Sequence, residues 1–345
     1  MSKRVNISYL FSIMLLLLTG CEQETSLAPS PIHGEEPVEI LLSANVVQVS
    51  ASILTRSDFL NETSFKDGTR KVGVFGLRTQ DGSFTDYPYV NNFALTNSSD
   101  GTLSGDGQIY FPAGYGTITA YLYGYYPYTA EAELVSQGND ILIPVKSGLS
   151  GVADGKWTNA GTDPLHATAA PTIERVENAV NERPSIPVTL TFKHMMAQLQ
   201  IFVNTATSDK YRLQEIITTF SKHQHGYMNV RNGEITSADS NSETITETFP
   251  SEDFIGAATA TAQSIHSVLP GTDAIQKIEV KIKIDGEENG KVYEAFNAAT
   301  ANKSINLTAG SITAVTINFN PNTATQASLD DTWNITEEHS FDFTN

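Results

Sequence analysis

Cys21 is the residue whose chemistry is easiest to identify, because it is the only cysteine among 345 residues. It ends the segment Leu18-Thr19-Gly20-Cys21, which follows the basic pair Lys3-Arg4 and an apolar run over residues 9–18. That run is too short to cross roughly 30 Å of hydrocarbon as a helix, and a small residue before a cysteine is typical of a bacterial lipoprotein signal. We therefore expect removal of the signal peptide 1–20 and acylation of Cys21, for example with palmitate. The alternative is an ordinary signal peptide in which a cysteine follows the cut by chance.

Histidines offer a second kind of chemistry, metal binding or acid–base catalysis. His223 and His225 are two residues apart and would share one face of a strand, but the spacing indicates no third metal ligand. His194 precedes two methionines, which favours a packed, hydrogen-bonded histidine over a catalytic base. The chain contains no Gly-x-Ser-x-Gly, no His-Glu-x-x-His and no phosphate-binding glycine loop. The sequence therefore predicts no catalytic residue, no metal site, no cofactor and no enzymatic activity.

Aromatic residues gather between Tyr121 and Tyr128, and their rings could stack on sugars. A glycan-binding face built from Tyr123, Tyr125, Tyr126 and Tyr128 is one interpretation. The alternative is that alternate tyrosines fill one face of a sheet while the others cover the opposite face. The pattern favours this packing alternative.

The charge balance excludes one broad class of partner. Residues 1–20 contain two of the 21 basic side chains and none of the 39 acidic ones, so the chain from Cys21 onward carries a net charge of −20. Nucleic-acid phosphates would repel such a surface, and we expect no nucleic-acid partner. The polar stretch 21–36 is typical of a flexible tether between a lipid and a folded body. Its acidic start also resembles the surface-export signal of lipoproteins in Bacteroidetes-type bacteria.

The elements that must position these residues are strands. Apolar and polar residues alternate over 188–192 and 278–284, and turn residues recur at short intervals, whereas helical patterns are few. The sequence predicts an all-β protein of two tandem β-sandwich domains, with a polar, proline-containing boundary near residues 181–184. The domains would cover residues 37–183 and 184–345.

The last segment, 329–345, has apolar residues only at odd positions, which is a strand pattern of period two. These residues are Leu329, Trp333, Ile335, Phe341 and Phe343. Burial of the last four in a neighbouring molecule would contribute roughly 6–12 kcal/mol in total, and pairing along a sheet edge would set the register. The segment is therefore a candidate donor strand. The alternative is a last strand that pairs within its own domain.

Several motifs, taken in order, resemble the fimbrillin (Mfa-like) family of Bacteroidales surface pilins. The most specific is Phe192-Lys193-His194-Met195-Met196-Ala197-Gln198-Leu199, which is similar to the family pattern F-x-H-x-(M/L)-A-(Q/K)-L and follows a strand. The other matching segments are Thr55-Arg56-Ser57, Val72-Gly73-Val74-Phe75, the stretch 111–128, Asp163-Pro164-Leu165-His166-Ala167, Val268-Leu269-Pro270 and Leu307-Thr308-Ala309-Gly310. Together they cover nearly the whole chain after the signal peptide.

The resemblance implies two transthyretin-like β-sandwich domains and a lipoprotein precursor that polymerises by strand exchange. An arginine-specific or trypsin-like protease would cut after Arg56, so that Ser57 becomes the new N-terminus. The first strand would leave with the lipid, and a strand of the next subunit would fill its groove. The residues before Arg56 have strand character, with Val38, Ile40 and Leu42 on one face. The alternative is an ordinary first strand followed by an uncut loop.

These expectations combine into a functional prediction. The chain would be a structural subunit of a surface fimbria, in the stalk, tip or anchor, held at the outer membrane by lipid on Cys21. Its partners would be other fimbrillin subunits, the processing protease and a ligand on a host or bacterial surface. The alternative function is a monomeric surface lipoprotein that binds glycan through the tyrosine-rich face.

Overall fold

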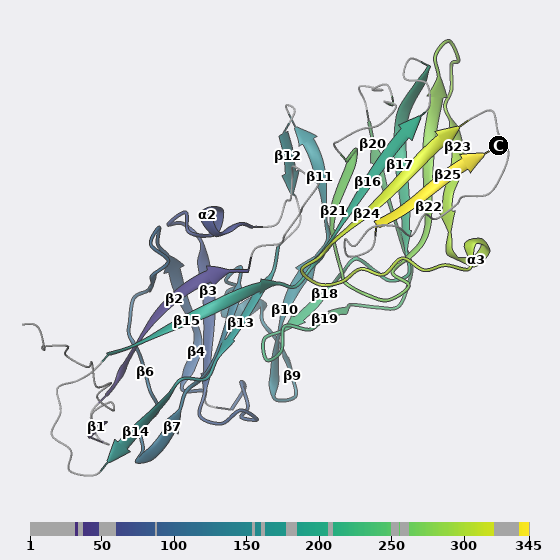
Figure 1. Ribbon diagram of the computed structural model, residues 1–345. Coiled ribbons are helices and arrows are strands. Elements are labelled where there is room, and N and C mark those ends of the chain that lie inside the picture. Colours follow the sequence, from purple (N-terminus) through teal and green to yellow (C-terminus); the bar gives the residue numbers. More distant parts are fainter. Residues whose placement is uncertain are drawn as a thin grey trace, which may run out of the picture.

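Strands dominate the protein, and the predicted all-β fold class is confirmed. They form two bodies that lie end to end (Figure 1). Cys21, Arg56, Ser57, Trp333 and Ile335 lie outside the residues that the structure describes. The computed structural model describes residues 32–33, 37–47, 60–86, 88–153, 156–159, 163–176, 185–205, 210–249, 255, 262–320 and 338–344.

Helical structure in the described ranges is limited to short turns. The elements are α2 (Glu62–Phe65), α3 (Ala298–Ala301) and the 3-10 turn η1 (Glu131–Glu133). None of the helices in these ranges has the length and apolar character needed to cross a lipid bilayer.

The N-terminal body is built on an eight-stranded sheet that closes on itself. Its strands, in spatial order, are β5 (Leu103–Ser104), β4 (Val90–Asn97), β3 (Lys71–Leu77), β8 (Tyr121–Tyr126), β13 (Leu165–Ala169), β15 (Ser185–His194), β2 (Glu39–Val46) and β6 (Ile109–Tyr110). The sheet closes where β2 meets the start of β5: the Ala44 amide donates to the Gly101 carbonyl at 2.8 Å, and Ser43 pairs with Thr102. The closed sheet surrounds a core to which β2 and the residue before it supply five buried side chains.

A second sheet covers β3 and β8 from outside, so these two strands are buried on both faces. Its strands are β19 (Ile235–Ser237), β18 (His225–Asn229), β10 (Asp140–Lys146) and β9 (Val135–Gln137). Phe75 and Tyr123 pack in the cluster beneath this sheet, whereas Val74 and Leu122 belong to the closed core. The near-continuous burial of β3 is typical of a strand covered on both sides. Three further strands extend the body: β1 (Ile32–His33), β14 (Thr172–Val176) and β7 (Gly116–Thr119).

The C-terminal body is a pair of facing sheets. The six-stranded sheet contains β12 (Lys156–Asn159), β11 (Gly148–Ala153), β21 (Ser264–Val268), β16 (Ala197–Thr205), β24 (Ile312–Asn320) and β25 (Glu338–Thr344). The four-stranded sheet contains β20 (Glu243–Thr248), β17 (Tyr211–Phe220), β22 (Ile275–Ile284) and β23 (Lys291–Asn297). Leu199 and Ile201 of the first sheet share one core with Ile278 and Val280 of the second. The alternating residues 188–192 and 278–284 therefore lie in strands, as predicted.

The chain passes back and forth between the two bodies, so each body contains strands from both halves of the sequence. β10 lies in the N-terminal body and β11 in the C-terminal body, with only Ser147 between them. β10 pairs with β18 from the second half of the sequence, while β11 pairs with β21. In each body, therefore, a strand from before the predicted boundary near residue 183 pairs with a strand from after it. The domain limits 37–183 and 184–345 stay predictions.

The tyrosine-rich strand β8 packs against other residues. Tyr123 and Tyr125 are 5% and 0% exposed, and Tyr126 and Tyr128 are half-buried. Tyr125 donates a hydrogen bond to Asn92 Oδ1 at 2.6 Å, and burial raises the pKa of its hydroxyl. For the two buried rings, this arrangement favours the packing alternative over a glycan-binding face.

Gly73 of β3 lies directly against the Tyr125 ring, and a Cβ atom there would stand 2.1 Å from Tyr125 Cε1. We expect Gly73→Ala to lower the free energy of unfolding by about 1–3 kcal/mol, because the ring must leave its hydrogen-bonded position. Gly271→Ala is the control, since its Cβ would meet no heavy atom closer than 3.9 Å. Urea unfolding followed by circular dichroism measures both variants, and equal stabilities would contradict this packing.

Candidate functional site: the strand β2 and its groove

β2 has one buried face and one exposed face. Its inward residues, together with the residue before it, are at most 5% exposed: Val38, Ile40, Leu42, Ala44 and Val46. Leu41, which is out of phase with them, is 47% exposed. Such alternation gives a strand that adds its apolar face to a core. Burial of the four larger side chains contributes roughly 6–12 kcal/mol before any opposing term.

β2 is paired along its whole length with β15, in parallel. The register runs from Glu39 opposite Ser185 to Val46 opposite Phe192. One residue further, the Val47 amide donates to the Phe192 carbonyl at 2.8 Å. On its other side β2 forms a two-residue ladder with β6. β2 therefore depends mainly on one neighbouring strand for its backbone hydrogen bonds.

β2 fills a groove between β15 and the segment 102–109. The walls of this groove are apolar and belong to the same core cluster as the β2 side chains, with Leu103 and Ile109 on one side and Leu190 and Phe192 on the other. A cleft of about 240 Å³ remains between β2 and the segment 102–109, so contact on that side is incomplete. Removal of β2 would expose the cluster to water, and another extended apolar segment has the chemistry to refill the groove.

Two side-chain contacts hold the chain on either side of residues 48–59. Before this segment, the Val46 amide donates to Glu62 Oε2 at 2.7 Å. After it, the Leu60 amide donates to Asp163 Oδ2 at 2.7 Å, and both carboxylate oxygens of Asp163 lie 3.0 Å from His194 Nδ1. The predicted cleavage site lies between these two anchors, outside the described residues.

Sequence reasoning found only part of this arrangement. His194 is 4% exposed and contacts Asp163, so the prediction of a packed, hydrogen-bonded histidine is confirmed. Both residues belong to segments that carried the family resemblance, but their spacing gave no sign that they would hold the Leu60 amide. Nothing in the sequence marked Glu62 as an anchor. A glutamate that accepts a hydrogen bond from a distant backbone amide cannot be told from any other glutamate by its sequence.

A serine, a histidine and a glutamate meet inside the C-terminal body, but their geometry is not that of an activated nucleophile. Ser264 Oγ and Glu247 Oε2 both contact Nε2 of His266, the glutamate at 3.5 Å. A catalytic serine needs the carboxylate on the opposite ring nitrogen and needs access to substrate, whereas Ser264 is 0% exposed. Burial raises the pKa of Glu247 to about 7 and lowers the pKa of His266 to about 4, so the pair is neutral between these values.

The C-terminal strand β25 lies at the edge of the six-stranded sheet, parallel to β24. In the register, Phe341 and Phe343 stand opposite two core residues of β24. Residues 338–344 thus pair within their own chain, as the alternative interpretation expects, and β25 has one strand neighbour in the described sheet. Trp333 and Ile335 lie outside the described residues. The donor face formed by these four residues stays a prediction.

Adjacent leucines in β2 test which face of the strand is inward. Leu42→Ala should lower the free energy of unfolding by about 2–5 kcal/mol, because it leaves a cavity in the closed core. Leu41→Ala is the matched control and should change stability by less than about 0.5 kcal/mol, because its side chain is half in solvent. Thermal and urea unfolding of the full chain measure both changes. Similar losses from the two variants would contradict the assigned phase of the strand.

The chain has relatives of known family. Its sequence matches the family model described as fimbrillin-like over residues 55–330. No curated protein sequence matches it. Two similar solved structures are of proteins with a proposed role in cell adhesion. The one from Bacteroides ovatus is 19% identical, with 82% of this chain and 92% of that chain covered and a TM-score of 0.47. The one from Bacteroides uniformis is 17% identical, with 82% of this chain and 92% of that chain covered and a TM-score of 0.48. The fimbrial anchor protein Mfa2 from Porphyromonas gingivalis is also similar, with 12% identity, 79% of this chain and 86% of that chain covered, and a TM-score of 0.33. Because the family match spans most of the sequence, the chain belongs to the fimbrillin-like family.

Proposed function

We propose that this chain is a fimbrial subunit assembled by strand exchange, in which cleavage after Arg56 frees β2 and a strand of the next subunit takes its place. The family match makes it a structural, non-enzymatic protein associated with cell-surface fimbriae and with other fimbrillin subunits. One observation carries the finer proposal. β2 occupies an apolar groove, yet its covalent link to the strands that follow it is the segment 48–59, which contains the arginine.

After such a cut, noncovalent forces alone would hold β2. Its four large inward side chains contribute roughly 6–12 kcal/mol. Fixing Val38 and the eight residues of this strand from a free chain costs roughly 9–18 kcal/mol of conformational entropy. The burial of these side chains does not exceed that cost, so backbone pairing with β15 decides whether β2 stays. A cut β2 is therefore exchangeable, and a strand with larger apolar side chains would bind the groove more tightly.

β25 has properties that suit a donor strand. It lies at a sheet edge, so its release from the described sheet breaks one ladder. It pairs with β24 in parallel, which is the sense in which β2 pairs with β15. Phe341 and Phe343, with Trp333 and Ile335 before them, offer more apolar area than the valines, leucine and isoleucine that β2 places in the groove.

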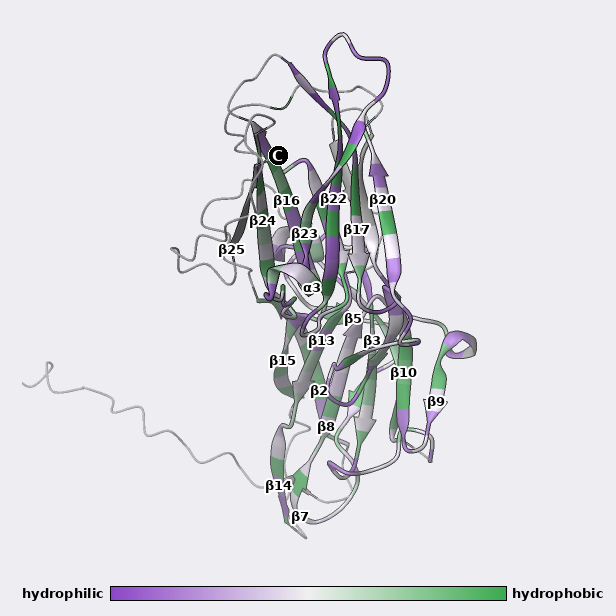
Figure 2. Cartoon of the chain, turned by 90° about the vertical axis from the view of Figure 1, so that its right-hand side faces the viewer, coloured by the Kyte–Doolittle hydropathy of each residue, from purple (hydrophilic) through white to green (hydrophobic). Residues whose placement is uncertain are grey.

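The two strands lie on different bodies. Figure 2 shows β25 on the C-terminal body, with its neighbour β24, and β2 on the other body, beside β15. Insertion of β25 from one subunit into the β2 groove of the next would join subunits head to tail. A head-to-tail contact repeats into a fibre when its rotation does not close a ring. One interface, used repeatedly, would therefore build the polymer.

Lipid on Cys21 would hold the precursor at the outer membrane until it is cut. Acyl chains anchor a protein through their buried methylene groups, without any spanning helix. Cleavage after Arg56 would leave the lipid and β2 together and release the rest of the chain for assembly. An uncut copy would remain at the membrane as an anchor, so processing would divide the stalk and tip roles from the anchor role.

Proteolysis of the full-length chain tests the release step. A trypsin-like protease should produce one main folded fragment that begins at Ser57, because Arg56 lies between the two anchors of the surrounding chain. Arg56→Ala should abolish this fragment, whereas Arg78→Ala, which changes an exposed residue, should not affect it. N-terminal sequencing reads the result directly. A main fragment with another N-terminus would argue against the proposed processing site.

Oligomer formation by the cleaved chain tests the donor strand. We expect a ladder of oligomers that survives mild detergent and disappears on boiling. Phe341→Asp combined with Phe343→Asp should remove the ladder, because two charges would enter the apolar groove. Ser340→Asp combined with Thr344→Asp adds the same charge at the opposite phase of the strand and should keep it. Electrophoresis compares the two, and identical ladders would exclude these phenylalanines as the inserted residues.

A further inference from the structure

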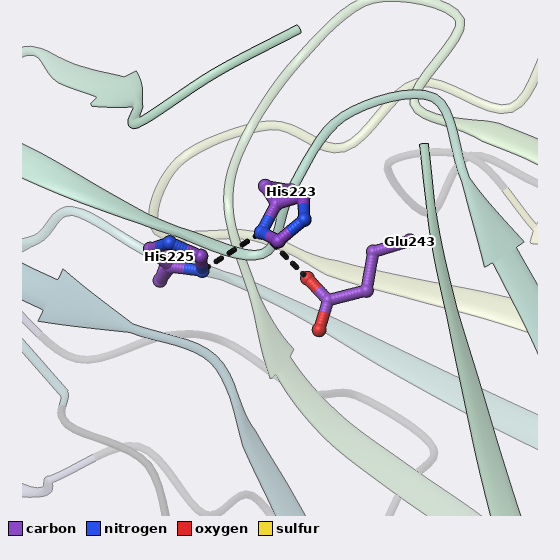
Figure 3. A group of neighbouring side chains, drawn as sticks. All are labelled: His223, His225 and Glu243. Atoms are coloured by element: carbon purple, nitrogen blue, oxygen red, sulfur yellow. Dashed lines mark hydrogen bonds and ion pairs between the residues drawn. The ribbon is translucent and has the colours of Figure 1, made fainter. Parts of the chain in front are cut away.

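Two histidines and a glutamate converge in the protein, as Figure 3 shows. They lie where β18 of the N-terminal body and β20 of the C-terminal body begin, apart from the β2 groove. His223 Nδ1 lies 3.0 Å from His225 Nδ1 and 3.8 Å from Glu243 Oε2. The three atoms that could act as ligands all lie within 4.8 Å of one another. The spacing of the histidines indicated no third ligand, but the fold brings Glu243 to them.

The three side chains come from different parts of the fold. His223 lies in the turn after β17, and His225 begins β18, which belongs to the sheet of the N-terminal body. Glu243 begins β20 in the C-terminal body, where it pairs with Phe220 at the end of β17. Any ion bound by all three would therefore contact both bodies.

Gln224, between the two histidines, fixes the backbone that presents them. It is 4% exposed; its side-chain Oε1 accepts from the Leu269 backbone amide at 3.0 Å, and its backbone N–H donates to Glu243 Oε2 at 2.6 Å. Ser237 Oγ donates to the His223 carbonyl at 2.8 Å. Hydrogen bonds to ligands and to their backbone are the contacts that orient a metal site. The fold thus fixes the backbone between the two histidines and the carboxylate of Glu243 by contacts that do not involve the imidazole rings.

Two imidazole nitrogens 3.0 Å apart cannot both carry a proton, because both would then be donors. They can share one proton, or a cation can bind between them. Zinc binds imidazole nitrogen at about 2.0–2.1 Å and carboxylate oxygen at about 2.0–2.2 Å, so ligands of a tetrahedral ion lie roughly 3.4 Å apart. Two of the three separations, 3.0 and 3.8 Å, fall on either side of that value, and the third lies within 4.8 Å.

We propose that His223, His225 and Glu243 bind one Zn²⁺ ion, with water as the fourth ligand, and that this ion links the two bodies. The proposal does not depend on strand exchange. The side chains of His223 and Glu243 are 31% and 33% exposed, so an ion can enter from solvent. A set of two imidazoles and one carboxylate favours zinc over calcium or magnesium, which prefer oxygen ligands. The basic residues nearest to the site along the chain and the register are Lys222, which precedes His223, and Lys146, which is opposite His225 in the β10–β18 ladder.

Calorimetric titration of the metal-free full chain with Zn²⁺ tests the site. We expect one ion per chain, displaceable by a chelator, and no competition from excess Mg²⁺. His223→Ala and Glu243→Gln should each weaken binding at least about tenfold. Glu234→Gln, an exposed residue on the neighbouring β18–β19 turn, is the matched control and should bind as the unchanged chain does. Circular dichroism without metal establishes that every variant is folded.

Hydrogen exchange tests whether the ion links the bodies. Saturating Zn²⁺ should slow amide exchange at residues 223–225 and 243–245 together, in the unchanged chain and in Glu234→Gln but not in Glu243→Gln. Absence of saturable binding, or binding of equal strength in all the variants, would overturn the site. One ion shared by two chains, seen as a metal-dependent dimer, would overturn the link within one chain.

Discussion

The parallel pairing of β2 with β15 is the interaction on which the N-terminal body depends. It joins residues 39–46 to residues 185–192, and it places β2 where this strand can meet the start of β5 and close the eight-stranded sheet around its core. Parallel strands so far apart in sequence lose much chain entropy when they meet, and no tight turn can bring them together. The buried face of β2 offsets that cost. Without β2 the core would be open along one side, so this strand, or an equivalent one, is required for the fold.

Periodicity predicted which segments are strands, but it could not predict their neighbours. The alternation in β15 and β22 could be recognised in the sequence because each strand has one face toward solvent and one buried face. β18 illustrates the limit: its residues 225–229 follow β17 directly, yet they pair with β10 of the other body. Strand partners depend on contacts between distant segments, which local residue patterns do not record. For the same reason, a polar stretch near residue 183 did not reveal that strands pass between the bodies.

The candidate site was predictable to a similar extent. The inward phase of Val38, Ile40 and Leu42 follows from alternation alone, and the structure shows the same phase. The contacts of Glu62 with the Val46 amide and of Asp163 with the Leu60 amide were not predictable, because a backbone amide has no sequence signature. The sequence also did not reveal that Glu243 lies beside His223 and His225. Pairing of β20 with β17 brings its carboxylate there, and the spacing of residues along the chain does not record that pairing.

The repeated passage of the chain between the two bodies has a mechanical consequence. The described strands place five crossings of the junction along the chain: at residue 147, between β12 and β13, at residues 195–196, at residues 221–224 and at residues 238–242. Two domains joined by a single linker bend freely about it. Here a bending motion would have to strain several covalent crossings at once, and a pull along the long axis would be divided among them. The junction between the two bodies would therefore resist both bending and tension. If subunits join as proposed above, a loaded fibre would yield first where the inserted strand lies along β15, and the two bodies of each subunit would stay together.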